Sequence, residues 1–221
     1  LGKKVAIKTL QSLSREELIS FQEEAKATSK LNHPNVVAIL DLGATESGAP
    51  YMVLSYINGT TLREFIDDHG WLEISIARKI FAKLASALDY AHSQKIFHRD
   101  IKPSNILLYQ NKDEIEVKII DFGVARVFYA TQEPTIVQGK TIVGTPGYMS
   151  PDQVNGFKYD ERSEIYSLGC VMFEALTGKP PFQGESALEI INKHAFEVVP
   201  DPVSMRPELI DYPDLVTLLN K

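Results

Sequence analysis

Residues 97–123 read FHRDIKPSNILLYQNKDEIEVKIIDFG, and the fold prediction starts from this stretch. Two short apolar runs, 106–108 and 117–120, flank a charged turn, which is the pattern of a β-hairpin. Because a hairpin reverses the chain, residues before the first run lie close to those after the second. The stretch therefore predicts that its polar residues gather at the open end of a hairpin.

Four of these polar residues have side chains suited to phosphate chemistry. Asp100, Lys102 and Asn105 precede the hairpin, and Asp121 follows it. Carboxylate and amide oxygens are the hard ligands that Mg²⁺ takes together with phosphate oxygens. An ammonium group neutralises phosphate charge, and a second carboxylate accepts a proton. The four residues thus predict a site for a metal-bound polyphosphate with a proton acceptor beside it.

The spacing of these residues carries a family resemblance. The His-Arg-Asp tripeptide at 98–100, followed by Lys102, Asn105 and then Asp-Phe-Gly at 121–123, resembles the catalytic and metal-binding loops of the protein kinases. The alternative is that these are ordinary turn residues, since Asp and Asn favour turns and Gly permits positive φ. That alternative needs the whole spacing to arise by chance, so we favour the kinase interpretation.

The resemblance implies an α+β protein with the bilobal protein-kinase fold: a small antiparallel β-sheet lobe with one key helix, and a larger, mainly helical lobe. It assigns residues 1–56 to the N-terminal lobe and residues 57–221 to the C-terminal lobe of one kinase domain. The family's Gly-x-Gly-x-x-Gly loop precedes the lysine strand, and here nothing stands before Leu1. Either this loop lies upstream in a longer protein or the chain binds nucleotide poorly; we favour the first. One or two further helices are expected after Lys221.

Composition sets outer bounds on the function. The chain has 221 residues and a formal net charge of -6, which argues against the broadly basic surface of a nucleic-acid-binding protein. The single cysteine, Cys170, excludes an intrachain disulfide and suits a buried thiol in a reducing, cytoplasmic location. No apolar run approaches the roughly 20 residues of a membrane span, so we expect no membrane contact from this segment.

The first part of the chain predicts a strand and a helix that pair a lysine with a glutamate. Segment 5–8 is a short strand that carries Lys8. Helical spacing and a capping-box serine at the first position predict a helix over 14–31, which carries Glu24. The resemblance implies that Lys8 contacts the α and β phosphates of ATP and pairs with Glu24. Glu23 is the alternative partner, and a solvated surface position is the alternative for each of these charges.

Five residues are expected to form the adenine pocket. By resemblance, Leu54 guards the back of the pocket, and Ser55 and Ile57 belong to the hinge whose backbone groups bond adenine. Ala6 and Leu107 supply its two apolar faces. An apolar slot with a few fixed polar backbone groups is the usual form of such a pocket.

Alternation and periodicity predict the remaining elements. They are strands at 36–42 and 51–56, a turn at 58–61, and helices at 62–68, 72–94 and 160–176. Apolar residues recur at helical spacing along the 72–94 segment, as in a buried helix that leads into the catalytic loop.

A long polar stretch, 124–143, follows the Asp-Phe-Gly motif and by resemblance is the activation segment. The Arg99 guanidinium beside Asp100 needs a counter-anion, which a phosphorylated threonine of this stretch can supply. We expect Thr141 to be the phosphorylation site, with Thr135 second. The alternative is that both threonines are unmodified loop residues.

The end of this stretch indicates the branch of the family. Thr145 lies in the sequence GTPGYMSP at 144–151, and together with Lys102 it resembles the serine/threonine-specific branch. The segment RSEIYSLG at 162–169 adds to this, and the overall pattern is most similar to the bacterial serine/threonine kinases.

Two further positions depart from the family pattern. Glu164 stands where the family usually has an Asp that braces the backbone of the catalytic loop, and its extra methylene predicts a looser brace. Asp152 stands where a Glu normally pairs with a late arginine, which we expect beyond Lys221.

The resemblance implies that this protein transfers the γ-phosphoryl group of ATP to Ser and Thr hydroxyls of proteins, including a second copy of itself. Asp100 would accept or orient the hydroxyl proton, and Lys102 would neutralise the moving phosphoryl group. Asn105 and Asp121 would hold Mg²⁺, with Mn²⁺ as the alternative ion. Positioning and electrostatic stabilisation would supply the rate.

Two other functions compete with this one. A pseudokinase or scaffold module would keep the fold without turnover, but Lys8, Asp100 and Asp121 are all present. A small-molecule kinase of similar fold is disfavoured by the long threonine-containing segment, which suits an extended peptide substrate.

Overall fold

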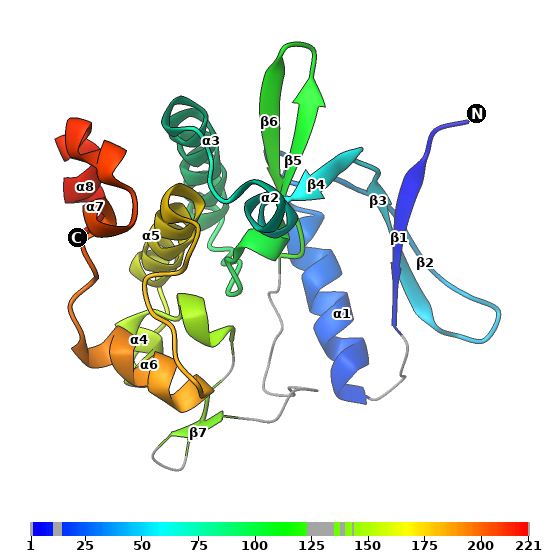
Figure 1. Cartoon of the computed structure of the whole chain (residues 1–221). Coiled ribbons are helices and arrows are strands. Elements are labelled where there is room, and N and C mark those ends of the chain that lie inside the picture. The colour runs from blue at the N-terminus through cyan, green and yellow to red at the C-terminus, as the bar shows by residue number, and fades with distance from the viewer. Residues whose placement is uncertain (1, 11–14, 123–134, 138–139, 143, 221) are drawn as a thin grey trace.

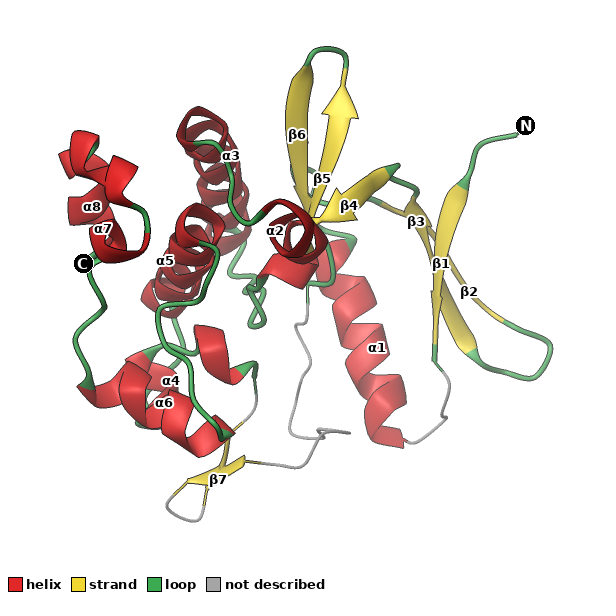
Figure 2. Cartoon of the chain, viewed as in Figure 1, coloured by secondary structure: helices red, strands yellow, loops and turns green. Residues whose placement is uncertain are grey.

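The computed structural model describes residues 2–10, 15–122, 135–137, 140–142 and 144–220. A strand-rich part lies beside a larger helical part, and the chain's N-terminus and C-terminus lie at opposite sides of the molecule (Figures 1 and 2). Ser14, the predicted helix cap, falls outside the described residues, and so do the side chains of Thr135 and Thr141.

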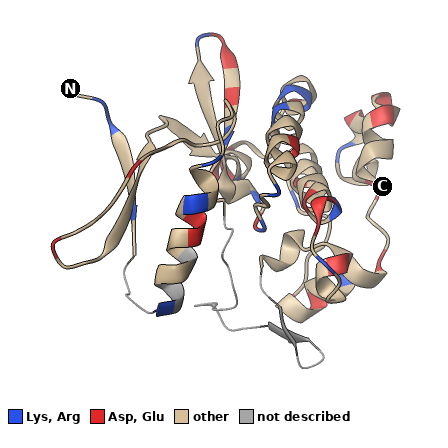
Figure 3. Ribbon diagram, turned by 180° about the vertical axis from the view of Figure 1, so that it is seen from behind, with Lys and Arg blue, Asp and Glu red and all other residues tan. Residues whose placement is uncertain are grey.

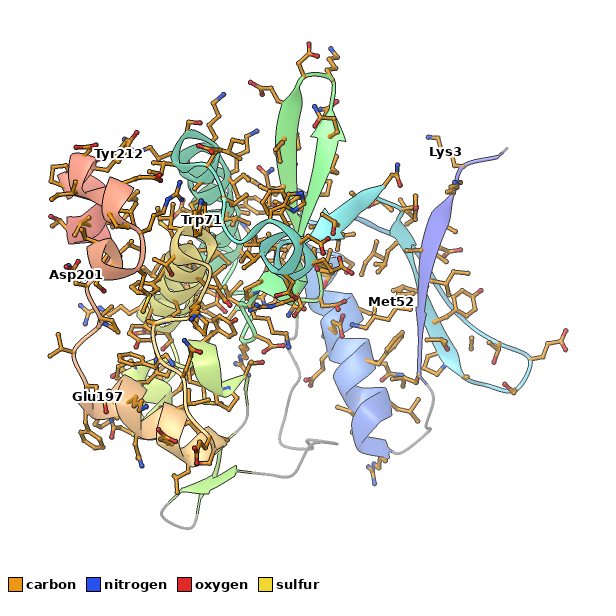
Figure 4. All side chains as sticks on the ribbon, in the orientation of Figure 1. Lys3, Met52, Trp71, Glu197, Asp201 and Tyr212 are labelled. Carbon is orange, nitrogen blue, oxygen red and sulfur yellow. The ribbon has the colours of Figure 1, made fainter. Side chains whose placement is uncertain are left out.

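The small sheet is antiparallel, with the strand order β1-β3-β2. Its strands are β1 (Val5–Thr9), β2 (Ile39–Ala44) and β3 (Pro50–Ser55). Helix α1 (Arg15–Thr28) covers one face, where Phe21 and Ala25 form a buried cluster with Met52 of β3. Figure 4 shows the Met52 side chain directed from the sheet toward α1. Burial of these apolar side chains holds the helix, and therefore Glu24, against the sheet.

The predicted bounds of the helix and of the next strand need correction. Helix α1 ends at Thr28 rather than at residue 31, because Leu31 donates its backbone N–H to Thr28 O in a tighter turn. The strand predicted at 36–42 begins only at Ile39. The Val37 N–H instead bonds Ile119 O at 3.0 Å, so this segment joins the catalytic hairpin before the chain enters the small sheet.

The hairpin predicted from the opening stretch is present as β5 (Ile106–Asn111) and β6 (Glu114–Ile119). A third strand, β4 (Gly59–Thr61), pairs with β5, although this segment was predicted to be a turn. Gly59 permits the pairing, because a Cβ there would lie 2.2 Å from Leu108 O. The three-residue strand carries no apolar alternation, which is why the sequence pattern did not reveal it.

The larger part is built on helices α3 (Ile74–Ser93) and α5 (Glu161–Thr177), which share one apolar core. The helix predicted from residue 72 starts two residues later, because the Leu72 N–H bonds Ala175 O of α5 at 2.7 Å. The other helices here are α2 (Leu62–His69), α4 (Pro151–Val154), α6 (Ala187–Phe196), α7 (Pro202–Met205) and α8 (Pro213–Leu219). Three short 3₁₀ turns complete the part: η1 (Pro103–Asn105), η2 (Pro146–Tyr148) and η3 (Pro207–Asp211).

Part of the predicted long polar stretch is a small hairpin. Strands β7 (Thr135–Val137) and β8 (Lys140–Ile142) pair antiparallel, with Thr135 opposite Ile142. The hairpin lies near α6 (Figure 1). The candidate phosphorylation sites Thr135 and Thr141 therefore both stand on paired backbone.

Charges of both signs are interspersed over the β5–β6 hairpin and α3 (Figure 3). Two ion pairs join these elements, Lys83 to Glu116 at 2.8 Å and Lys79 to Glu114 at 3.7 Å. No helix in the described part of the chain is both long enough and apolar enough to cross a membrane.

Candidate active site

The β5–β6 hairpin brings the two halves of the predicted site together. Ile120 donates its backbone N–H to Asn105 O at 3.0 Å, so Asp121 emerges beside Asn105. His98 Nε2 bonds Ile120 O at 2.9 Å, and the His98 ring packs on the fully buried Phe122 ring with centroids 4.8 Å apart. These contacts fix the residues on either side of Asp121.

Among the described residues, two of the non-glycine positions with positive φ belong to this site. Arg99 has φ of 67° and Asp121 has φ of 56°. Such left-handed conformations are uncommon in residues other than glycine and persist where the surrounding structure enforces them. Around Asp121 the hydrogen bonds of Ile120 and the packing of Phe122 supply that enforcement. Around Arg99 it comes from the backbone N–H groups of Arg99 and Asp100, which donate to Glu164 Oε1 and His98 Nδ1.

The Asp100 carboxylate is contacted by three side chains. Thr145 Oγ1 donates to Asp100 Oδ1 at 2.8 Å, and Lys102 Nζ lies 2.7 Å from Oδ2. Asn105 Nδ2 donates to Asp100 O at 2.8 Å and to Oδ2 at 3.3 Å. The Lys102 ammonium also donates to Thr145 Oγ1 at 3.3 Å. The three predicted catalytic residues Asp100, Lys102 and Asn105 and the predicted substrate-loop residue Thr145 thus form one connected cluster.

The Lys8 ammonium joins the small sheet to the hairpin. It lies 2.7 Å from Glu24 Oε1 and 2.9 Å from Asp121 Oδ1. Burial alone lowers the pKa of Lys8, but the two carboxylates outweigh it, so the pKa is raised and the group stays charged at neutral pH. Glu23, the alternative partner, is exposed. The structure therefore selects Glu24.

The donor set at the end of the hairpin fits a magnesium ion. Because Asn105 uses its Nδ2 on Asp100, it is the carbonyl oxygen of this amide that can face a cation. The Asp121 side chain is 42% exposed and offers hard carboxylate oxygens. No group of three His, Cys, Asp or Glu gathers as a metal cage among the described residues. Two protein oxygens with nucleotide phosphates are the usual environment of Mg²⁺.

Four of the predicted adenine residues come from three strands, and Ile57 lies in the connection between β3 and β4. Ala6 of β1 stands opposite Leu54 of β3, and Leu107 lies half-buried on β5. Ser55 donates its backbone N–H to Ala38 O at 2.9 Å. Because the Ser55 N–H already has a partner, we expect the Ser55 carbonyl and the backbone of Ile57 to be the hinge groups that bond adenine.

Glu164 contacts the catalytic loop directly, so the brace is present with Glu in place of the usual Asp. Its Oε1 accepts the Arg99 backbone N–H at 2.7 Å and the Tyr159 hydroxyl at 3.0 Å, and its Oε2 lies 2.7 Å from His92 Nε2. The side chain is 0% exposed. Burial, and then the charge of Glu164, raise the pKa of Tyr159, so its phenol stays protonated and donates. The extra methylene is used to reach three partners.

His92 and Tyr159 were not predicted as part of this brace. His92 follows Leu88 by four residues, which places it on the buried stripe of α3. A buried polar group on an apolar stripe needs a partner, so this spacing was a signal that could have been used. Tyr159 carried no comparable signal.

The Arg99 guanidinium lies over the Tyr159 ring, 6.0 Å from its centroid. Across the described ranges, no carboxylate forms an ion pair with it. Arg99, Asp100 and Thr145 line a small hollow together with Tyr148. A cation at the rim of the catalytic cluster is thus available to an anion.

The fold and the arrangement of the site are those expected of a protein kinase domain, and comparison with known families agrees. The family model described as protein kinase domain matches residues 1–211, and the chain belongs to this family.

Curated relatives narrow the class to bacterial serine/threonine kinases. The chain is 40% identical over 220 residues to the probable serine/threonine-protein kinase PknB of Bifidobacterium longum, covering 95% of this chain and 31% of the relative. It is 37% identical to serine/threonine-protein kinase pkn3 of Myxococcus xanthus, covering 94% and 39%. It is 39% identical to PknB of Mycobacterium leprae, covering 94% and 33%. The chain thus spans about a third of the length of these relatives.

Proposed function

We propose that this protein transfers the γ-phosphoryl group of ATP to Ser and Thr hydroxyls of protein substrates. The observation that carries the proposal is the cluster around Asp100, where Lys102, Asn105 and Thr145 all bond one carboxylate group. A proton acceptor beside a phosphate-neutralising ammonium is what phosphoryl transfer asks of a protein. The names of the relatives support the same reaction.

The reaction makes little demand for covalent chemistry by the protein. The substrate oxygen attacks the γ-phosphorus, the bond from this phosphorus to the bridging oxygen breaks, and ADP leaves. Asp100 orients the attacking hydroxyl and takes its proton, while Lys102 offsets negative charge on the moving phosphoryl group. Lys8 positions the α and β phosphates, and Glu24 holds it. Asn105 and Asp121 would hold Mg²⁺, or Mn²⁺ in its place, and the ion would supply further charge neutralisation.

The adenine site is proposed between the small sheet and the hairpin. Leu54 would close its back, Ala6 and Leu107 would cover the two faces of the ring, and the Ser55 carbonyl and Ile57 backbone would bond its edge. The opposition of Ala6 and Leu54 in adjacent strands supports this placement. The lobe boundary between residues 56 and 57 belongs to the same proposal.

Regulation by phosphorylation is proposed for the activation segment. Arg99 reaches over Tyr159 and pairs with no carboxylate in the part of the chain that the structure describes. A phosphothreonine would give this cation two or three charge-assisted hydrogen bonds and so order the segment. Thr141 is the first candidate and Thr135 the second. The phosphate donor is ATP, so we propose a cytoplasmic location for the domain.

The experiment that tests the function is intact mass spectrometry of the full-length protein after incubation with Mg-ATP. The matched control is Asp100→Asn, which keeps the size of the side chain. Added phosphate on the parent protein alone supports the proposal, and fragmentation then locates it at Thr141, Thr135 or elsewhere. If neither protein gains mass and a generic protein substrate also stays unmodified, the scaffold function replaces this one.

A further inference from the structure

The buried carboxylate of Glu174 has no part in the proposed reaction, although it contacts Tyr148, three residues after Thr145. Glu174 of α5 has a side chain that is 1% exposed. Its Oε1 lies 2.5 Å from Arg63 Nη2, and its Oε2 accepts the Tyr148 hydroxyl at 2.6 Å. The same Arg63 nitrogen donates to the Tyr148 oxygen at 2.8 Å. Three groups from three elements, α2, η2 and α5, therefore form a closed triangle.

Tyr148 is held at both of its ends. Its phenolic oxygen lies in the triangle, and its backbone carbonyl accepts a hydrogen bond from the Ser167 hydroxyl at 2.7 Å. Its backbone N–H bonds Thr145 O at 3.0 Å, which closes the 3₁₀ turn η2. Thr145 thus stands one short turn from an anchored residue. The turn has no freedom to shift unless Tyr148 shifts with it.

The chemistry of the triangle makes the anchor rigid at neutral pH. Burial, and then the charge of Glu174, raise the pKa of Tyr148, so the phenol stays protonated and donates. Burial alone lowers the pKa of Arg63, but its bonds to Glu174 and its other partners raise it overall. A buried charge that loses one partner remains uncompensated, so the triangle resists opening.

We propose that Glu174 and Arg63 are positioning residues for phosphoryl transfer. They fix Tyr148 and, through the η2 turn, hold the Thr145 hydroxyl against Asp100 and Lys102. The proposal rests on the proposed kinase function. Thr145 Oγ1 bonds Asp100, which is proposed to take the hydroxyl proton, at 2.8 Å, and Lys102, which is proposed to neutralise the phosphoryl group, at 3.3 Å. A looser turn spreads the positions of this hydroxyl and costs rate, since small misplacements at a reacting centre are expensive.

The first test compares Tyr148→Phe with the parent in the full-length protein, using a Ser-containing peptide and Mg-ATP. The variant keeps the ring and removes the hydroxyl. We expect kcat for the peptide to fall about tenfold while the KM for ATP changes by less than about twofold. An unchanged kcat overturns the proposal. An equal loss of ATP affinity also overturns it, because that pattern indicates general destabilisation.

A double-mutant cycle separates positioning from simple structural support. If the triangle acts through Thr145, then Tyr148→Phe has little further effect in a Thr145→Ala background. If the fold-loss of kcat in the double variant equals the product of the two single-variant losses, the two residues act independently and the proposal is overturned. Arg63→Lys is a second route, because it keeps the charge and one donor direction. We expect it to lose less kcat than Arg63→Met, and equal losses from both changes contradict the role of the bridging nitrogen.

Two controls keep the outcomes distinguishable. Arg78→Gln removes an exposed ion pair with Asp214 elsewhere on the helical part and is expected to change neither kcat nor the cycle. Asp100→Asn reports on the proposed function itself. A parent protein without turnover above this variant ends the kinase proposal, whereas turnover that Tyr148→Phe leaves intact ends only the positioning proposal.

Discussion

Two clusters of polar and charged side chains differ in their exposure to solvent. One surrounds Lys8 and includes Asp121, and the other surrounds Glu164, which contacts the catalytic loop. The side chains around Lys8 are 34%, 16% and 42% exposed for Lys8, Glu24 and Asp121. The brace around Glu164 is closed, with Glu164 at 0% and His92 at 7%. The open cluster leaves carboxylate oxygens and an ammonium group accessible to a ligand, whereas the polar atoms of the closed cluster are hydrogen-bonded to other parts of the protein. The comparison indicates that the cluster around Lys8 binds the ligand and that the cluster around Glu164 stabilises the catalytic loop.

The largest expected effect is at Asp100, which belongs to the catalytic cluster rather than to either of these two and has a side chain that is only 9% exposed. Replacing Asp100 with Asn removes the proton acceptor while keeping the side chain's size, so kcat should fall by about 10³-fold, within the range for general base catalysis. The melting temperature should change little. Steady-state phosphorylation of a peptide and a thermal melt measure both. A variant that loses stability and activity in parallel would remove the distinction between residues that act on the ligand and residues that stabilise the catalytic loop.

Lys8→Met should follow at about 10²-fold in kcat/KM for ATP, because the ammonium that meets the α and β phosphates is lost. The fold should persist, since the lysine is partly exposed and its ion pairs contribute modestly to stability. Kinetics over a range of ATP concentrations, with a circular dichroism spectrum as the control, test this. A collapsed spectrum would contradict a ligand-binding role.

Glu164→Gln should show the opposite pattern, a large loss of stability. The carboxylate takes part in three hydrogen bonds, and the amide of Gln cannot accept all of them. Leaving a buried donor without a partner costs about 1–3 kcal/mol, which corresponds to a fall in melting temperature of roughly 2–12 °C for a domain of this size. Glu164→Asp tests the reach of the side chain. If the pocket is built for three partners at this length, the shorter acid also destabilises the domain. A fully stable Glu164→Asp would show that the extra methylene is incidental.

Stability should also depend on pH, because His194 is buried outside both clusters. His194 lies against Tyr166 and Phe182, and burial lowers its pKa to about 4. The unfolded chain binds this proton more tightly, so stability is lost as pH falls from the ordinary histidine pKa of about 6.5 toward 4. The loss should reach about 3 kcal/mol at most. Melts across this pH range on the parent and on His194→Gln measure it, and identical slopes would contradict it.

The smallest effect is expected at an ion pair on the surface. Arg78 and Asp214 make two contacts at 3.0 and 2.8 Å, yet their side chains are 46% and 69% exposed. Arg78→Gln should cost less than about 1 kcal/mol and lose even that at high salt. Denaturant titrations at two ionic strengths check it. A cost comparable with that of Glu164→Gln would show that exposure does not separate the two classes of charge.

The parts of the molecule that could be predicted are those with a local pattern or a motif. The hairpin followed from two apolar runs around a charged turn, and Lys8, Glu24 and the cluster around Asp100 followed from motif spacing. Strand β4 was missed because its three residues are Gly and Thr, whose pairing depends on a partner strand far along the chain.

The missed side-chain partners share one physical reason. Arg63 and Glu174 are 111 residues apart, and each looks like an ordinary helix charge in its own segment. His92 and Glu164 are 72 residues apart and meet only because α3 packs on α5. Pairs of this kind are products of tertiary packing, so no local pattern specifies them.

The segment that follows α1 has a mechanical consequence. Asn35 O accepts the Ile119 N–H at 2.8 Å, Val37 returns a bond to Ile119 O at 3.0 Å, and the Asn35 side chain donates to Val117 O at 2.8 Å. These bonds stitch the base of α1 to the hairpin that carries Asp121. If the small sheet rotates relative to the helical part, we expect α1 to rotate with it about the hydrogen bonds that Asn35 and Val37 make with β6, which we call the seam. Glu24, near the seam, then travels less than the far end of the helix, and the Lys8 pairing can survive the motion.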